Sequence, residues 1–191
     1  MRVLSLGLAG LALSFACSQP ASAQYWYDPM TPETMPYLGD TRPQAAPSSR
    51  QLVSFSPQYA PGMIVISTRA RRLYYVTARG QAIEYPVGVG RPGFEWSGTK
   101  TITRKAEWPS WTPPAQMIKR RPDLPRYMSG GIANPLGARA LYLGSSLYRI
   151  HGSNEPETIG QAVSSGCIRM TNDDVIDLYR RVRVGTRVTV M

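Results

Sequence analysis

The most constraining feature of this chain is a series of short β-rich runs that continues from Gly62 to the end. Each run is rich in valine, isoleucine, threonine or tyrosine, and glycines or basic turns separate the runs. Runs of this length and composition are typical of strands in hairpins and meanders. They occupy residues 63–67, 72–77, 82–87, 140–143, 146–150 and 185–190. The sequence therefore predicts a mostly β domain over residues 62–191.

One helix is expected, directly after residue 170. Thr171 is suited to cap it, with Asp174 three residues later as the capping-box partner. Basic residues favour its C-terminal end, and Gly185 is expected to stop it. The helix begins just after Cys167, so its dipole modestly favours a thiolate there. Its apolar positions recur at helical spacing, at Val175, Leu178, Tyr179 and Val182.

The residues before Gly62 are expected to lie outside the folded domain. Residues 1–23 have the features of a secretory signal, with a small-x-small cleavage site that ends at Ala23. Lipidation at Cys17 is the alternative, although the bulky Phe15 makes the context poor for it. Residues 24–61 are rich in proline and serine and are expected to form a flexible linker. The mature protein is thus expected in the periplasm, without a transmembrane segment.

The chain has 191 residues, which suits one domain, and a net charge of +10. Nucleic acid is one class of partner for so basic a chain. Export and the dispersed placement of the basic residues exclude that partner here. A carboxylate-rich envelope polymer or an anionic membrane face fits better, while the remaining alternative is that the charge only keeps the protein soluble.

His151 is the only histidine, and it lies sixteen residues before Cys167. A thiol becomes a strong nucleophile when a neighbour takes its proton or lowers its pKa. Signal cleavage removes Cys17, so Cys167 is expected to be the only thiol of the mature chain. Any Cys–His catalysis must therefore use this pair. The alternative is that Cys167 is a buried, inert side chain.

The residues beside Cys167 suit an acyl-transfer site. Ser165 and Gly166 allow a tight turn that presents the thiol, and the N–H groups of Gly166 and Cys167 are expected to form an oxyanion hole. Arg169 lies on the same side of an extended backbone as Cys167, where it is expected to hold a substrate carboxylate or keep the thiolate charged. The Gly152 carbonyl is expected to orient His151 by accepting its Nδ1 proton.

No metal or cofactor site is visible in the sequence. One histidine and one cysteine without a spacing pattern fall short of a zinc ligand set. Residues 88–93 formally match a dinucleotide fingerprint, but Pro92 and the residues after it do not open a helix, so a turn between strands is expected instead. Trp111, within the proline-rich residues 108–114, is expected either to line a cleft or to stabilise a rigid loop.

Several motifs together resemble the L,D-transpeptidase catalytic domain of the YkuD (ErfK/YbiS-like) type. They are His151-Gly152-Ser153, then Gly160, then Ser164-Ser-Gly-Cys-Ile-Arg-Met170. Further similarity lies at residues 85–90, 108–114, 134–137 and 185–190, in the same order along the chain. The family commonly has histidine where this chain has Ser165, and threonine where it has Ser153. The likeness covers most of residues 62–191.

The resemblance implies a β-sandwich or barrel-like domain, with one or two short helices beside the site, that acts on peptidoglycan stem peptides. Cys167 is then the nucleophile, His151 its proton acceptor and Arg169 a neighbouring arginine, while Gly152 orients the imidazole. The thiolate attacks the diaminopimelate carbonyl, D-Ala leaves, and an amine of another stem or of an envelope protein takes the acyl group. Substrate contacts are expected from Ser153, Ser164, Ser165 and Trp111. No cofactor is implied, and inhibition by carbapenems is expected.

Two other functions stay open at this stage. Water in place of an amine as acceptor makes the protein an L,D-carboxypeptidase or hydrolase of the same bond. A wall-binding module without catalysis is the second, but the joint presence of His151, Cys167 and Arg169 argues against it. A sortase-like enzyme also pairs cysteine, histidine and arginine, and the short spacing between His151 and Cys167 disfavours it.

Overall fold

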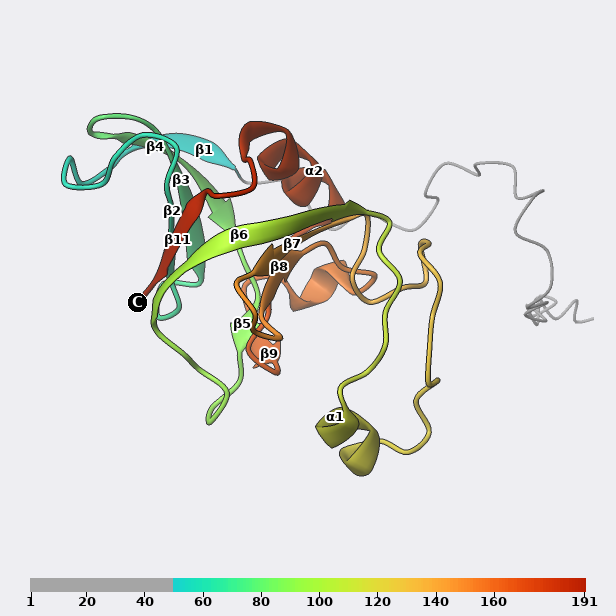
Figure 1. The fold of residues 1–191 in the computed structure, drawn as a ribbon. Coiled ribbons are helices and arrows are strands. Elements are labelled where there is room, and N and C mark those ends of the chain that lie inside the picture. The colour runs from blue at the N-terminus through green and yellow to red at the C-terminus, as the bar shows by residue number, and fades with distance from the viewer. Residues whose placement is uncertain (1–49) are drawn as a thin grey trace, which may run out of the picture. The chain divides into compact units, whose positions relative to one another are not determined.

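The computed structural model describes residues 50–191 (Figure 1). The expected signal peptide, Cys17 and most of the expected linker lie outside the described residues. Eleven strands and two α-helices follow one another, so the mostly β prediction is confirmed. The strands are β1 (Gln51–Ser54), β2 (Ile64–Ser67), β3 (Arg72–Ala78), β4 (Gln81–Pro86), β5 (Val89–Gly90), β6 (Gly98–Glu107), β7 (Arg139–Leu143), β8 (Arg149–His151), β9 (Ala162–Ser164), β10 (Ile168–Arg169) and β11 (Arg187–Val190). The helices are α1 (Ala115–Arg120), the 3-10 helix η1 (Pro156–Thr158) and α2 (Asn172–Arg181).

Nine strands form one sheet in the order β1-β4-β3-β2-β11-β6-β7-β8-β10, and β5 pairs with β9 separately. The last strand, β11, lies between β2, with which it is parallel, and β6, with which it is antiparallel. It therefore joins the N-terminal meander β1–β4 to the half of the sheet that contains β6, β7 and β8. The other parallel pair of this sheet is β8 with β10, at the opposite edge from β1.

The core lies between the curved sheet and helix α2, which packs against β7 and β8 (Figure 1). Strand β2 is buried along Ile64, Val65 and Ile66, and α2 contributes Val175 and Leu178. Burial of each such side chain stabilises the fold by about 1.5–3 kcal/mol. The other fully buried large side chains include Leu73, Tyr85, Ile102, Leu141, Leu143, Ile150 and Ile168. Within residues 50–191, no helix is long and apolar enough to cross a membrane.

The folded domain begins earlier than the sequence predicted. Gln51–Ser54, part of the expected linker, forms β1 and pairs with β4 from Glu84 to Gln81. Cross-strand backbone hydrogen bonds hold this short, exposed segment, which has no apolar period of its own, so the sheet begins before Gly62, within the expected linker. The long strand β6 was also missed, since its only fully buried side chain is Ile102.

Helix α2 begins as predicted and ends sooner. Thr171 caps it, and its hydroxyl accepts a hydrogen bond from the Asp174 N–H at 3.2 Å. The helix ends at Arg181 rather than running on to Gly185. Lys105 of β6 closes this end, because its ammonium donates to the carbonyls of Tyr179 and Val182 at 2.7 and 2.6 Å. A cation from another strand thus satisfies carbonyls that a helix end leaves free.

Candidate active site

The parallel pairing of β8 with β10 brings His151 and Cys167, the predicted base and nucleophile, to one face of the sheet. Ile150 pairs with Ile168, and both side chains are buried in the core. Successive residues of a strand face opposite sides. His151 and Arg169, which pair one step later, therefore face away from that core, and Cys167 lies one step earlier, beside Arg149. We call Arg149, His151, Cys167 and Arg169 the β8–β10 cluster.

His151 is held as a neutral base. Its Nδ1 lies 2.6 Å from the Gly152 carbonyl, and because a carbonyl only accepts, Nδ1 carries the proton and Nε2 is left to accept another. The ring is 4% exposed. Burial, helped by the positive charges of Arg169 and Arg149, lowers the pKa of His151 to about 3, against the opposing bond to Gly152. The imidazole is therefore uncharged at neutral pH.

Glycine is required beside His151 because the chain passes close to its neighbours. A Cβ on Gly152 would lie 2.3 Å from the Asn172 side-chain oxygen and 3.0 Å from the Ala138 nitrogen. That same oxygen of Asn172, the first residue of α2, accepts from the Ala138 N–H at 2.9 Å. Helix α2 thereby fixes the strand ends that carry the imidazole, which is a role for Asn172 that the sequence did not reveal.

Cys167 is partly buried and is the free cysteine among the described residues. Its Sγ lies 3.6 Å from the Leu147 carbonyl, a weak contact that a thiol donates. Across residues 50–191, no hydrogen bond joins this thiol to His151. Burial raises the pKa of Cys167, while the charge and hydrogen bonds of Arg149 and the charge of Arg169 oppose the rise. The resting site is thus a thiol beside a neutral imidazole.

The turn before Cys167 is fixed by its own hydrogen bonds. The Ser164 hydroxyl donates to the Cys167 carbonyl at 2.7 Å and accepts from the Gly166 N–H at 3.0 Å. The Gly166 N–H, expected to line the oxyanion hole, is therefore engaged. The Cys167 N–H has no hydrogen-bond partner among the described residues, so it is the donor that remains for an oxyanion.

Gly166 is packed between aromatic side chains. Its φ is +101°, and a Cβ there would lie 2.6 Å from Tyr148 Cε1. The Trp96 indole donates to the Gly166 carbonyl at 2.8 Å and stacks on Tyr148, with ring centroids 4.5 Å apart. The Lys100 ammonium lies over both rings. This stack forms one wall beside the nucleophile.

Phe94, another aromatic residue beside the same turn, packs against two arginines. The guanidinium of Arg91 lies 4.1 Å from the centroid of the Phe94 ring, and that of Arg120 from α1 lies 5.4 Å from it. Arg91 also donates to the Ser165 hydroxyl at 3.5 Å. Neither arginine has an acidic partner within 4 Å among residues 50–191. Of these two cations, Arg91 contacts the residue before Gly166, and Arg120 lies on the Phe94 ring.

Arg169 is engaged by the protein itself. Its guanidinium pairs with Glu155 at 2.8 Å and donates to Thr158 of η1 at 3.3 Å. Ser153 fixes this segment, because its hydroxyl accepts from the Glu155 N–H at 3.0 Å. Ser153 therefore positions the partner of Arg169, and the carboxylate that Arg169 holds in this structure is Glu155.

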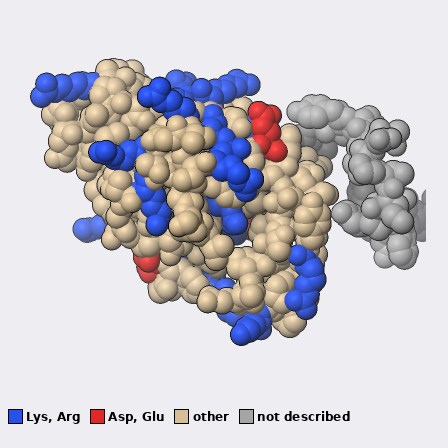
Figure 2. All heavy atoms as spheres, viewed as in Figure 1, with Lys and Arg blue, Asp and Glu red and all other residues tan. Residues whose placement is uncertain are grey.

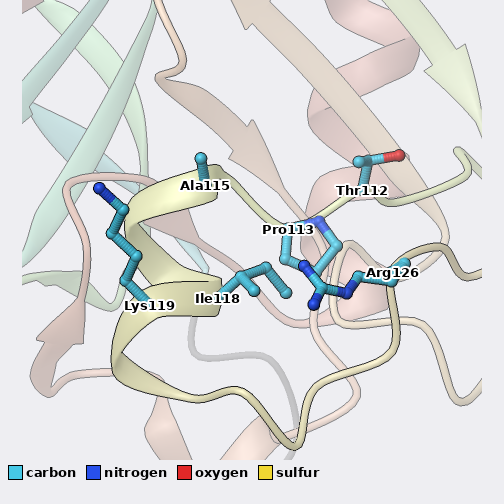
Figure 3. A pocket seen from close by; sticks show the side chains of 6 residues that line it. All are labelled: Thr112, Pro113, Ala115, Ile118, Lys119 and Arg126. Carbon is cyan, nitrogen blue, oxygen red and sulfur yellow. The ribbon is translucent and has the colours of Figure 1, made fainter.

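Trp111 lies apart from the β8–β10 cluster. Its backbone pairs with Met128, and its indole is almost buried. Among residues 50–191, no hydrogen bond joins Trp111 to Cys167, and its expected role, lining a cleft or stabilising a rigid loop, stays a prediction. A cavity of about 410 Å³ lies nearby, under α1 (Figure 3). It is lined by Thr112, Pro113, Ala115, Ile118, Lys119 and Arg126.

The glycine-rich residues 88–93 form β5 and a turn, and from residue 50 onward the first helix is α1, which begins at Ala115. Gly88 exchanges backbone hydrogen bonds with Arg169, at 2.9 Å in both directions. Gly88 therefore supports the β10 strand. Within residues 50–191, no three histidine, cysteine or acidic side chains gather to hold a metal ion.

The chain is similar in sequence to a known family of catalytic domains. The family model of the L,D-transpeptidase catalytic domain, YkuD, matches residues 61–190. The probable L,D-transpeptidase ErfK/SrfK of Escherichia coli is 41% identical over 135 residues, which cover 67% of this chain and 43% of that protein. The chain thus spans less than half the length of this curated relative.

Two solved structures are similar in fold. One, titled a probable carnitine operon oxidoreductase from Brucella melitensis, is 45% identical, covers 74% of this chain and 92% of that one, and has a TM-score of 0.51. The other is L,D-transpeptidase 3 from Mycobacterium tuberculosis in complex with a faropenem-derived adduct, at 19% identity, 68% and 59% coverage and a TM-score of 0.55. At that identity, the second likeness shows the fold alone.

Proposed function

Because this chain belongs to the YkuD family of L,D-transpeptidase catalytic domains, we propose that it transfers acyl groups of peptidoglycan stem peptides through a thioester on Cys167. One observation carries the proposal: the β8–β10 pairing sets Cys167 and His151 on one face, with the Nδ1 proton held by Gly152 at 2.6 Å. A nucleophile, a base and a group that orients the base are the parts that covalent acyl transfer needs.

In the acylation step, the Sγ–H bond breaks and the proton passes to His151 Nε2. The Cys167 thiolate attacks the carbonyl carbon of the diaminopimelate residue, and the oxyanion that forms is received by the Cys167 N–H. The imidazolium then returns its proton to the nitrogen of the leaving D-Ala. Collapse of the tetrahedral intermediate breaks the C–N bond and leaves a thioester on Cys167. Once the proton has passed to D-Ala, His151 is neutral again, because burial disfavours its charge.

In the second step, His151 takes a proton from the acceptor amine as the amine nitrogen attacks the thioester carbonyl. The C–S bond then breaks, and His151 returns the proton to the Cys167 sulfur, which leaves as the thiol. A side-chain amine of another stem gives a 3→3 cross-link, and an amine of an envelope protein gives attachment of that protein to the wall. Water in the same position gives hydrolysis. The chemistry at Cys167 is the same for all three acceptors.

The charges around the site support a substrate that carries carboxylates. Arg91, Arg120 and Lys100 lie on aromatic rings beside the Cys167 turn, and none has an acidic partner within 4 Å among residues 50–191. A ring covers one side of each cation and leaves its N–H groups to bind an anion. Figure 2 shows Lys and Arg spread over the face of the described part, with few Asp or Glu between them. Stem peptides supply several carboxylates.

The proposal includes the place of action and the inhibitor class. The secretory features of residues 1–23 support export to the periplasm, where peptidoglycan lies. Membership of the family supports acylation of Cys167 by carbapenems and related β-lactams, while the faropenem-derived adduct itself belongs to the mycobacterial protein. The oxidoreductase title belongs to the Brucella protein, and residues 88–93 of this chain do not begin a helix that would hold a dinucleotide.

The test is incubation of the mature chain, from Gln24, with diaminopimelate-type tetrapeptide muropeptides, followed by mass spectrometry of the products. Wild type is expected to give a 3→3 dimer, and Cys167→Ala is expected to give none. Tripeptide without dimer identifies hydrolysis in place of transfer. If folded wild type yields neither product nor a carbapenem adduct on Cys167, the proposed function is wrong.

A further inference from the structure

Arg149, which the sequence did not single out, adjoins the nucleophile. We propose that its guanidinium binds and stabilises the Cys167 thiolate at the moment the thiol proton moves to His151. This role rests on Cys167 being the nucleophile of the proposed function. The catalytic set is then Cys167, His151 and Arg149, a thiol with one base and one cation.

The register of the sheet places Arg149 beside the thiol. Ile150 pairs with Ile168, so Arg149, the first residue of β8, lies next to Cys167, which directly precedes β10. Arg149 and His151 are two residues apart on β8 and therefore share the face opposite the buried Ile150. Base and cation thus reach the sulfur from one strand.

The guanidinium of Arg149 is oriented but has an unused donor. It lies 5.3 Å from the centroid of the Tyr142 ring on the neighbouring strand β7, which limits where it can point. Its Nε is buried and has no hydrogen-bond partner among residues 50–191. A buried donor left unpaired costs about 1–3 kcal/mol. A thiolate at Cys167 is a stronger acceptor for this guanidinium than the resting thiol is.

Arg149 is better suited to this role than the other cations near the thiol. Arg169 has its charge countered by Glu155 at 2.8 Å, and Arg91 reaches only as far as the Ser165 hydroxyl. Arg149 has no acidic partner within 4 Å in the described part of the chain. Among the charged groups, it opposes most strongly the burial that raises the pKa of Cys167.

Arg149 offsets the cost of forming a negative charge on the buried Cys167 sulfur. His151 is so buried that its cationic form is disfavoured, and a lone thiolate beside it is disfavoured for the same reason. A fixed cation next to the sulfur stabilises the anion without needing the imidazolium to do so. Proton transfer from Sγ to Nε2 then becomes accessible before Cys167 is acylated.

The test measures the thiol and needs no substrate. Iodoacetamide alkylation of the full chain is followed from pH 6 to pH 10, with the modified peptide at Cys167 separated from that at Cys17 by mass spectrometry. Arg149→Gln is expected to raise the apparent thiol pKa by about one unit, which lowers the alkylation rate at pH 7 about tenfold. Arg149→Lys keeps a charge but loses the fork, and is expected to be slowed about threefold.

Arg104→Gln is the matched control, because Arg104 lies on the same Tyr142 ring, is exposed, and does not adjoin the thiol. It is expected to react as wild type does. Thermal denaturation checks that each variant is folded, and if Arg149→Gln does not fold, Arg149→Lys decides. An unchanged pH profile in the folded Arg149 variant overturns the proposal. Normal alkylation profiles with no muropeptide product in wild type would instead count against the proposed function.

Discussion

Gly166→Ala tests whether the turn before Cys167 is held by the contacts described. The backbone there has φ +101°, which costs an L residue about 1–2 kcal/mol. The new methyl would lie 2.6 Å from Tyr148 Cε1, so the ring must move and lose its stack on Trp96. The stack contributes about 0.5–1.5 kcal/mol and the Trp96–Gly166 hydrogen bond about 1 kcal/mol. The expected loss of unfolding free energy is about 3–4 kcal/mol.

Gly185→Ala provides the matched control for the backbone cost. Its φ is +91°, and nothing lies within 4 Å of a Cβ built there. Urea denaturation of the two variants is expected to show a loss of about 1–2 kcal/mol for Gly185→Ala and about twice that for Gly166→Ala. Equal losses would show that the aromatic wall does not hold Gly166, and the reasoning about this turn would be refuted.

Three further predictions concern charge. The pKa of His151 is lowered to about 3 in the folded protein, so below the usual histidine pKa the unfolded chain binds more protons than the folded protein does. The free energy of unfolding should therefore fall by about 2 kcal/mol from pH 7 to pH 5. Urea denaturation should show a smaller fall in His151→Gln. Lys105→Met removes both hydrogen bonds to the end of α2 and should cost about 2 kcal/mol in the same assay, whereas Met at the exposed Lys119 should cost under about 0.5 kcal/mol. Arg91→Gln should raise KM for the tetrapeptide donor about tenfold with kcat little changed, and an unchanged KM would exclude Arg91 from carboxylate binding.

The start of α2 was predictable because its signals are local. Thr171 and Asp174 are three residues apart, and the cap they form needs no other part of the chain. Its end was not, because Lys105 lies on a distant strand and replaces the expected glycine stop. Local patterns thus identified the element, and tertiary contacts set its length.

Some strands could likewise be predicted from local sequence, and others depend on contacts with distant parts of the chain. The apolar runs at β2, β3 and β4 were evident, since their buried positions show in the sequence. Strand β6 is largely polar, and β1 is short and exposed, so hydrogen bonds to neighbouring strands define both. Such pairing leaves little trace in the composition of a segment.

Some residues of the site could be predicted from their spacing in the sequence, and others only from the register in which the strands pair. His151 and Cys167 stood out as a lone histidine and a thiol on a glycine turn. Arg149 did not, because its relation to Cys167 depends on the pairing of β8 with β10. The Gly166 N–H was expected to line the oxyanion hole, but it donates to the Ser164 hydroxyl instead. The signal for Arg149 was its position two residues before His151 on an extended strand.

The central claim is that Cys167 forms a thioester with the stem peptide while D-Ala leaves. Intact-protein mass spectrometry tests it most directly, on the mature chain mixed with tetrapeptide donor and no acceptor amine. The account predicts an added tripeptide acyl group, located at Cys167 by peptide mapping, released by hydroxylamine and absent from Cys167→Ala. Release of D-Ala that continues in folded Cys167→Ala would contradict it.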